Sequence, residues 1–111
     1  MHASFDARRG VLTFAALFPG VEASSGMVAG LRAQVASRST RDQPSHKRLD
    51  ARRARVSCAV RGGDWSLVAQ IRGANHEYAV RKALNLINEL FISLHDRYPE
   101  YLTERFGLST E

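Results

Sequence analysis

The residues best suited to chemistry in this chain are lysines and arginines gathered in its middle. Residues 38–61 hold eight of the sixteen basic residues and only two acids, Asp42 and Asp50. A cluster of this kind suits the phosphates of a nucleic-acid backbone, and such binding would weaken steeply with salt. The competing interpretation is a solvated loop that binds nothing. The candidate phosphate-binding residues are Arg48, Arg52, Arg53 and Arg55.

Two properties limit this nucleic-acid hypothesis. No Phe, Tyr or Trp occurs between residues 19 and 64, so the segment lacks the aromatic platform on which single-stranded bases stack. The net charge of +5 favours an anionic partner without specifying one. We therefore expect any binding to phosphates to be mostly independent of base sequence.

A second set of candidate residues is aromatic and lies in the C-terminal part of the chain. Together with nearby leucines, these rings offer more apolar surface than one small sheet can bury, and the excess would form a homodimer or protein-docking surface. The alternative is that the rings belong entirely to the hydrophobic core. The candidate anchors of the interface are Phe91, Tyr98, Tyr101 and Phe106.

Patterns that would indicate catalysis or metal binding are missing from the sequence. The one cysteine, Cys58, excludes an intramolecular disulfide and is expected in the core as a small hydrophobic residue. His46, His76 and His95 are too scattered to supply the three or four ligands of a zinc site, and no phosphate-binding loop is present. We therefore expect no enzyme activity, cofactor, metal or small-molecule substrate.

Length and composition indicate one domain, residues 1–111, because a chain of this size folds alone without much spare core. Its 44% hydrophobic and 24% charged residues are typical of soluble globular proteins. The uncharged stretch at 10–21 is too short to span a bilayer, and the N-terminus lacks the order of a secretory signal. We expect a cytoplasmic protein that does not bind membranes.

The first half of the chain predicts one strand and one helix. The apolar run VLTFAALF at 11–18 stops at Pro19-Gly20, and its β-branched and aromatic residues favour a strand. Residues 1–9 are expected to be loose or to extend that strand. A helix is predicted from about Ser25 to Arg38, with Ser24 or Ser25 as its cap. A basic loop at about 38–54 follows, and the sequence leaves its order open.

The segment 55–70 predicts a β-hairpin with a defined register. Gly62-Gly63 suit a two-residue turn that places Arg61 opposite Asp64. One face of the hairpin is then apolar throughout, and a slip of one residue would expose the tryptophan. The pairs on that face are Val60 with Trp65, Cys58 with Leu67, and Val56 with Ala69.

A long helix is predicted from an N-cap at Asn75 to about Arg97, followed by a bend at Tyr98 and a short helix over 99–106. Apolar residues recur along the long helix at spacings of three and four, which is typical of a buried stripe. The predicted stripe consists of Val80, Leu84, Ile87, Phe91, Leu94 and Tyr98, widened by Ala83, Leu86 and Leu90.

Together these elements predict an α+β protein, a two-layer sandwich with a small, antiparallel-containing sheet of three or four strands. The expected order is strand, helix, strand, strand, helix, helix, with the helices on one face of the sheet. This order resembles the KH-type RNA-binding arrangement. The GxxG loop of that family is replaced here by Gly26 and Gly30, spaced GxxxG, so the resemblance implies no function.

The sequence therefore leaves two functional hypotheses. The first is a small non-enzymatic binding or adaptor protein that self-associates or docks to a protein partner through its long C-terminal helix and aromatic tail. The alternative is a nucleic-acid binder that uses the basic segment 38–61 on backbone phosphates.

Overall fold

The computed structural model describes residues 2–22, 24–40, 43 and 48–106. Four strands and three helices follow one another in these residues: β1 (His2–Asp6), β2 (Val11–Phe18), α1 (Gly26–Ser37), β3 (Ala54–Arg61), β4 (Asp64–Ile71), α2 (His76–Arg97) and α3 (Pro99–Phe106). The strands form one antiparallel sheet in the order β1-β2-β4-β3. The predicted α+β class with a small antiparallel sheet is confirmed.

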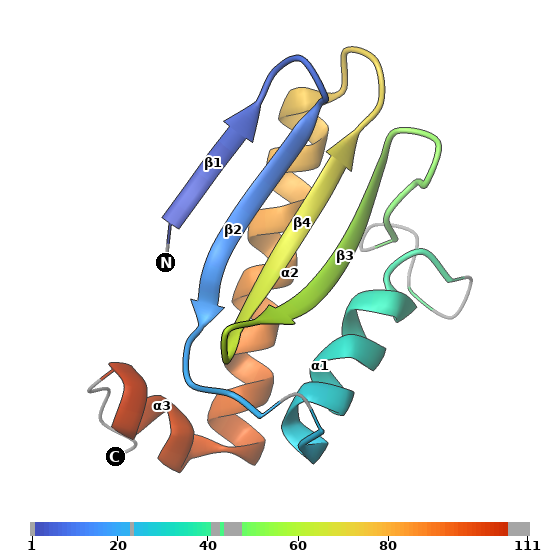
Figure 1. Ribbon diagram of the computed structural model, residues 1–111. Helices are drawn as coiled ribbons and strands as arrows, with labels where there is room; N and C mark the ends of the chain where they lie inside the picture. The colour runs from blue at the N-terminus through green and yellow to red at the C-terminus, as the bar shows by residue number, and fades with distance from the viewer. Residues whose placement is uncertain (1, 23, 41–42, 44–47, 107–111) are drawn as a thin grey trace.

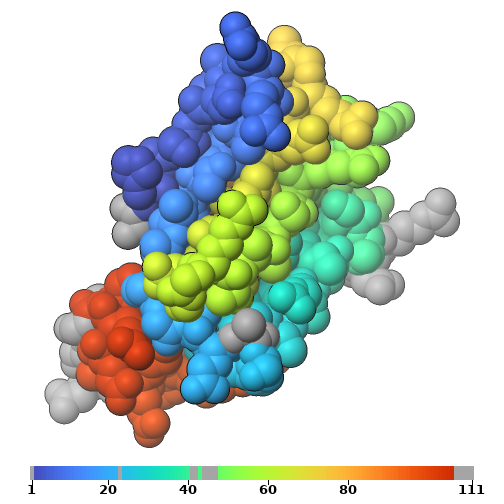
Figure 2. Space-filling model, in the orientation of Figure 1, coloured from blue at the N-terminus to red at the C-terminus, as the bar shows by residue number. Residues whose placement is uncertain are grey.

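The helices cover only part of one face of the sheet. Figure 1 shows α2 behind β2 and β4, α1 beside β3, and no helix behind β1. The other face of the sheet is turned toward the viewer in Figure 2, where β1 (dark blue) lies along the left margin. The edge strand β1 is therefore left without a helix behind it.

The structure corrects the expectation for residues 1–9. His2–Asp6 form a separate strand that pairs with β2 from His2 opposite Ala15 to Asp6 opposite Val11. The five residues alternate polar and apolar side chains, but the pattern is only five residues long and all five residues are exposed, so it is a weak signal for a strand. The sheet consequently has four strands, and one of its edges is β1.

An irregularity in β2 explains why its sequence is apolar at both odd and even positions. Phe14 pairs with Leu67 and Phe18 with Trp65, so three residues of β2 lie opposite one residue of β4, Ser66. Ala16, at the centre of this bulge, has a φ of +51°. The bulge turns both Leu17 and the adjacent Phe18 into the core, whereas consecutive residues of a regular strand face opposite sides.

The predicted hairpin is confirmed residue by residue. β3 and β4 pair from Ala54 opposite Ile71 to Arg61 opposite Asp64, and Val60 lies opposite Trp65 as expected. Gly62 and Gly63 both have positive φ, which the tight turn requires and glycine adopts without strain.

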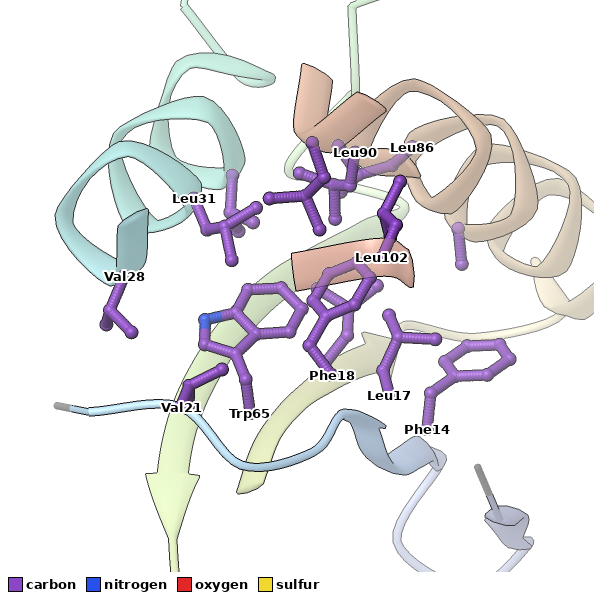
Figure 3. Close-up of a cluster of buried hydrophobic side chains, with 14 residues drawn as sticks. Phe14, Leu17, Phe18, Val21, Val28, Leu31, Trp65, Leu86, Leu90 and Leu102 are labelled. Atoms are coloured by element: carbon purple, nitrogen blue, oxygen red, sulfur yellow. The ribbon is translucent and has the colours of Figure 1, made fainter. Parts of the chain in front are cut away.

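The main hydrophobic core lies between the hairpin, β2 and the two longer helices. Figure 3 shows Trp65 and Phe18 beneath Leu31 of α1 and Leu90 of α2. Trp65, Phe18 and Leu90 are fully buried, and burying a large apolar side chain stabilises the fold by about 1.5–3 kcal/mol. The predicted cap of α1 is confirmed, because Ser25 Oγ accepts a hydrogen bond from the Val28 N–H at 3.2 Å.

The buried face of α2 is rotated from the predicted stripe. Its buried residues include Ala79, Ala83, Leu86, Leu90 and Leu94, whereas Val80 is 39% exposed and Leu84 52%. The prediction that these two residues are buried is wrong. The predicted stripe included Ala83 only at its margin and did not include Ala79, yet both alanines are fully buried.

Candidate interaction surfaces

An exposed apolar surface lies where the start of α2 meets the uncovered edge strand β1. Phe5 of β1 is 45% exposed, and Val80 and Leu84 of α2 add to it. The ring of Phe5 meets the imidazole of His76 edge to face, with centroids 5.4 Å apart. We name Phe5, Val80 and Leu84 the β1–α2 surface.

Helix geometry places Val80 and Leu84 on the β1 side of α2. His76, Val80 and Leu84 are successive positions four residues apart, so they form one row along the helix, and the first of them contacts Phe5. Glu89, which pairs with Arg38 at the end of α1, lies ~180° around the helix from Val80. The row therefore faces away from α1.

The margin of the β1–α2 surface is polar. Val80 and Leu84 line a shallow depression together with Glu77, Arg81 and Asn85. An apolar centre surrounded by polar, solvated groups is the usual anatomy of a protein–protein interface. The sequence pointed to these apolar residues, but it assigned them to the core.

The four aromatic residues predicted as interface anchors lie mainly within the protein's own packing. The ring of Phe91 packs edge-on against Phe18 at 5.1 Å and against Phe106 at 5.5 Å. Tyr101 contacts Phe106 in turn, with centroids 6.3 Å apart. Phe91, Tyr101 and Phe106 are each half-buried, so together they close the α3 end of the core, while Tyr98 is 38% exposed.

Tyr101 is held by its hydroxyl as well as its ring. The O–H donates to the backbone carbonyl of Pro19 at 2.6 Å, and this hydrogen bond ties α3 to the end of β2. Burial, with a smaller contribution from the negative charge of Asp64, raises the pKa of Tyr101 to about 12. These contacts indicate that the ring supports the fold rather than offering itself to a partner.

Two of the predicted phosphate-binding arginines already bind groups of the chain. Arg52 pairs with Asp50 at 3.2 Å, although its side chain is 91% exposed. Its hydrogen bond lowers the pKa of the Asp50 carboxyl. Arg53 donates to Asn75 Oδ1 at 3.0 Å and lies over the ring of Tyr78, 3.9 Å from its centroid.

These contacts explain why Asn75 does not cap α2 as predicted. Its side chain makes no capping hydrogen bond. The oxygen accepts from Arg53 and the amide nitrogen donates to the carbonyl of Arg72. Asn75 therefore fastens the segment before β3 to the end of β4, while the backbone position at the start of the helix is the one expected.

The remaining basic residues are divided between the interior and the surface. Arg48 donates to the carbonyl of Gln43 at 3.1 Å. Arg38 is only 6% exposed and forms an ion pair with Glu89, and desolvation lowers the pKa of its guanidinium. Arg55 lies exposed in β3 on the face of the sheet opposite the helices. Arg41, Lys47 and His46 lie outside the described residues.

A cavity of about 240 Å³ lies between the end of α1, the middle of α2 and Leu49. Its walls include the Arg38–Glu89 pair and Lys82. Desolvation, together with the charges of neighbouring arginines, lowers the pKa of Lys82. The cavity thus has more positive than negative charge.

The expected core position of Cys58 is supported by its surroundings. It lies opposite Leu67 in the hairpin and packs, partly buried, against the main core. Burial raises the pKa of the thiol, which disfavours the reactive thiolate. His95 lies 3.7 Å from the carboxylate of Asp96 at the end of α2.

The described part of the chain contains no group of three or more His, Cys, Asp or Glu side chains placed to hold a metal ion. None of the helices in that part is long and apolar enough to cross a bilayer. No protein family matches this chain, and comparisons with curated proteins and with solved structures find no similar protein.

Proposed function

We propose that this protein is a small, non-enzymatic binding protein that docks a protein partner through the β1–α2 surface. The observation that carries the proposal is that three exposed apolar side chains, Phe5, Val80 and Leu84, lie beside the edge strand β1, which has no helix behind it. A partner helix or strand placed there would complete the second layer. The cytoplasmic location expected from the sequence remains part of this proposal.

The proposed interface uses residues near the start of α2 in place of the predicted aromatic residues at the end of α2 and in α3. Phe91, Tyr101 and Phe106 support the end of α2 from within, so we assign the contact with the partner to Val80 and Leu84. Interface energy is concentrated in a few central apolar groups. Of the two helix residues, Leu84 is the larger and the more exposed, at 52% against 39% for Val80, so it gains more on burial.

The test compares two glutamate substitutions on the same helix. Proteins captured from cell lysate by the wild type are identified, purified and titrated calorimetrically against each variant. Leu84→Glu should weaken binding at least about tenfold, because it forces a charge into an apolar contact. Ile92→Glu is the matched control, since Ile92 is 53% exposed but lies ~12 Å further along α2 than Leu84, outside the depression that Val80 and Leu84 line.

A partner that binds Leu84→Glu as tightly as the wild type would contradict docking at this surface. Equal weakening by Ile92→Glu would mean that charge anywhere on α2 disturbs the helix. Apolar docking should also be nearly unchanged between 50 mM and 500 mM salt, roughly the range over which phosphate contacts lose most of their affinity.

Nucleic-acid binding through the basic segment is our second candidate. It is supported by Arg55 and Arg61, which lie on the bare face of the sheet and form no ion pair with any described residue. Arg52 could join them, because an exposed ion pair such as Arg52–Asp50 is easily exchanged for another anion. Arg53 and Arg48 are less suited, since other groups of the chain bind them.

Fluorescence anisotropy with a labelled random oligonucleotide tests this candidate. The pair Arg52→Glu with Arg55→Glu should abolish binding at low salt. Arg81→Glu with Arg97→Glu changes the net charge equally on α2 and should weaken binding much less. If both double variants lost the same oligonucleotide affinity, the binding would depend on net charge alone and not on the basic segment. If the wild type did not bind the oligonucleotide at low salt, nucleic-acid binding would be excluded.

A further inference from the structure

We infer that a second copy of this chain binds along the open edge of β1, in antiparallel register, and joins the two four-stranded sheets into one. This inference deepens the proposed function, because a second copy would extend the floor of the β1–α2 surface beyond β1. β1 is an edge of the sheet, and an edge strand presents a row of backbone N–H and C=O groups that can pair with another chain.

The sequence of β1 is complementary to itself. When two antiparallel copies pair about a two-fold axis at Ser4, all five residues of the strand His2–Asp6 find a partner. His2 then lies opposite Asp6 of the second copy, twice in the dimer. An imidazole N–H can donate a hydrogen bond to a carboxylate, and polar pairs directly across two strands are favourable, so this register is held at both of its ends.

The same register also covers Phe5. Ala3 and Phe5 lie on the helix side of β1, because they pair with Phe14 and Leu12. In the dimer Phe5 lies opposite Ala3 of the second copy, and the two Phe5 rings become diagonal neighbours, roughly 7–8 Å apart at the backbone and within reach of each other. The small Ala3 leaves room for both rings. Each exposed ring thereby gains an apolar neighbour.

The other edge of the sheet has the opposite character. β3 carries Arg55 and Arg61 on one face, and Arg53 immediately precedes it. A two-fold pairing about Ser57 or Cys58, positions four and five of its eight, would put Arg53 or Arg55 opposite Arg61 of the second copy. Like charges directly opposite each other are destabilising. β3 is thus protected against self-pairing, and β1, without Lys, Arg or Pro, is not.

An interface made by one five-residue strand is smaller than the roughly 1,600 Å² of a typical stable complex. We therefore expect an association that depends on concentration. The first measurement is light-scattering molar mass, from roughly 1 μM to 1 mM protein, the range in which weak interfaces of this class dissociate. The mass should rise toward twice 12.3 kDa and should be insensitive to an added oligonucleotide.

Disulfide trapping tests the register. Ser4→Cys places two thiols across the two-fold axis and should give a covalent dimer under mild oxidation. Thr103→Cys, an exposed position on α3, is the matched control and should stay monomeric. The wild type controls for Cys58, which is partly buried. A Ser4→Cys protein that cross-links no faster than the Thr103→Cys control would overturn the inference.

Charge exchange tests the same register independently. His2→Asp puts two acids face to face at each end of the strand pair and should weaken dimerisation about tenfold. The double variant His2→Asp with Asp6→Lys places opposite charges across the strand pair and should bring the affinity back at least to that of the wild type. Since Asp6 accepts a hydrogen bond from the Arg9 N–H, circular dichroism must show an unchanged fold. Failure of the double variant to recover, with its fold intact, would contradict the register.

The outcomes separate this inference from the proposed function. If the wild type stays monomeric up to about 1 mM, β1 pairing is overturned. Docking of a partner at Leu84 is then still tested separately by the calorimetric titration. A dimer that Leu84→Glu dissociates, while Ser4→Cys fails to cross-link, also overturns β1 pairing and makes the β1–α2 surface itself the dimer contact. A dimer that cross-links at Ser4→Cys and tolerates Leu84→Glu supports the inference.

Discussion

At the residue scale, backbone strain is concentrated in Ala16. It is the only non-glycine residue with positive φ among those that the structure describes, and its φ is +51°. The left-handed region costs an L-residue about 1–2 kcal/mol. The bulge keeps this conformation because the Ala16 N–H donates to Ser66 Oγ at 3.0 Å and because the change of direction buries Leu17 and Phe18.

Replacing Ala16 by glycine should therefore stabilise the protein. Relief of the strain exceeds the entropy cost of glycine, which leaves a gain of about 0.5–1 kcal/mol. Urea unfolding measures the difference in free energy. Ala15→Gly is the control, since Ala15 lies in the paired part of β2 and should lose about the same amount. A destabilised Ala16→Gly variant would show that the bulge is not strained.

A second prediction at this scale concerns alkaline pH. Because the pKa of Tyr101 is raised to about 12, the folded state disfavours the tyrosinate. Its contribution to stability is complete below about pH 10, the ordinary value for tyrosine, and is lost as the pH rises toward 12. The free energy of unfolding of the wild type should fall over this range more than that of Tyr101→Phe.

The same variant separates the hydroxyl from the ring. At pH 7 Tyr101→Phe should lose about 1 kcal/mol, because the carbonyl of Pro19 loses its donor. The two stability curves should then converge at alkaline pH. Parallel curves between pH 9 and pH 11, a range that brackets the ordinary tyrosine pKa of about 10, would contradict the assigned role of Tyr101.

At the scale of elements, two glycines illustrate why residue type alone does not give a residue's role. Gly10 joins β1 to β2 at a φ of +64°, and a Cβ there would lie 2.8 Å from the carbonyl oxygen of Ile71. Gly30 lies in α1 with nothing within 4 Å of an added Cβ. The first is required by the turn, whereas the second only weakens its helix.

Alanine at these two positions should consequently have opposite effects. Gly10→Ala should destabilise the protein by about 2 kcal/mol through strain and the clash with Ile71. Gly30→Ala should stabilise it by about 1 kcal/mol, the difference in helix propensity. Thermal unfolding of the two variants checks both signs in one experiment. If Gly10→Ala stabilised the protein, the turn between β1 and β2 could not have the positive φ and the close approach to Ile71 described above.

Sequence reasoning succeeded where a local pattern and a tertiary requirement coincide. The hairpin register follows from Gly62-Gly63 and from the burial of Trp65, and the structure has both. It failed for β1, whose residues are all exposed and whose pairing is set by β2 alone. The rotation of α2 could not be read from periodicity either, because its apolar residues extend over more than the buried face.

The roles of charged side chains were the least predictable part of the candidate sites. Arg38 and Arg53 lie in the same basic segment as Arg55, yet one is buried against Glu89 and another lies on Tyr78. Their partners are more than 20 residues away in the sequence, so no spacing rule connects them. Only the remaining exposed arginines are available for a phosphate.

At the scale of the whole molecule, the described residues contain two hydrophobic clusters rather than one. The main cluster includes Trp65 and Leu90. The smaller one contains Leu49, Ala54, Ile71, Tyr78 and Ala79, and it holds the segment before β3 against α2. The Leu49 N–H donates to the Arg38 carbonyl at 2.8 Å, and the Asp50 N–H donates to the Tyr78 hydroxyl at 2.8 Å.

Because the clusters are separate, we predict that hydrogen exchange distinguishes global unfolding of the main cluster from local opening of the smaller one. Leu90→Ala should lower global stability by about 2–5 kcal/mol, because Leu90 is fully buried in the main cluster. Leu49→Ala should speed exchange mainly at the amides of Leu49, Asp50 and Arg53, since small clusters open locally at lower free energy than the whole fold. Exchange in β4 should be nearly unchanged. Leu49→Ala could instead accelerate exchange of Leu67 in β4 as much as that of Asp50. The two clusters would then unfold as one unit. In that case the basic segment could not rearrange toward a ligand without loss of the sheet.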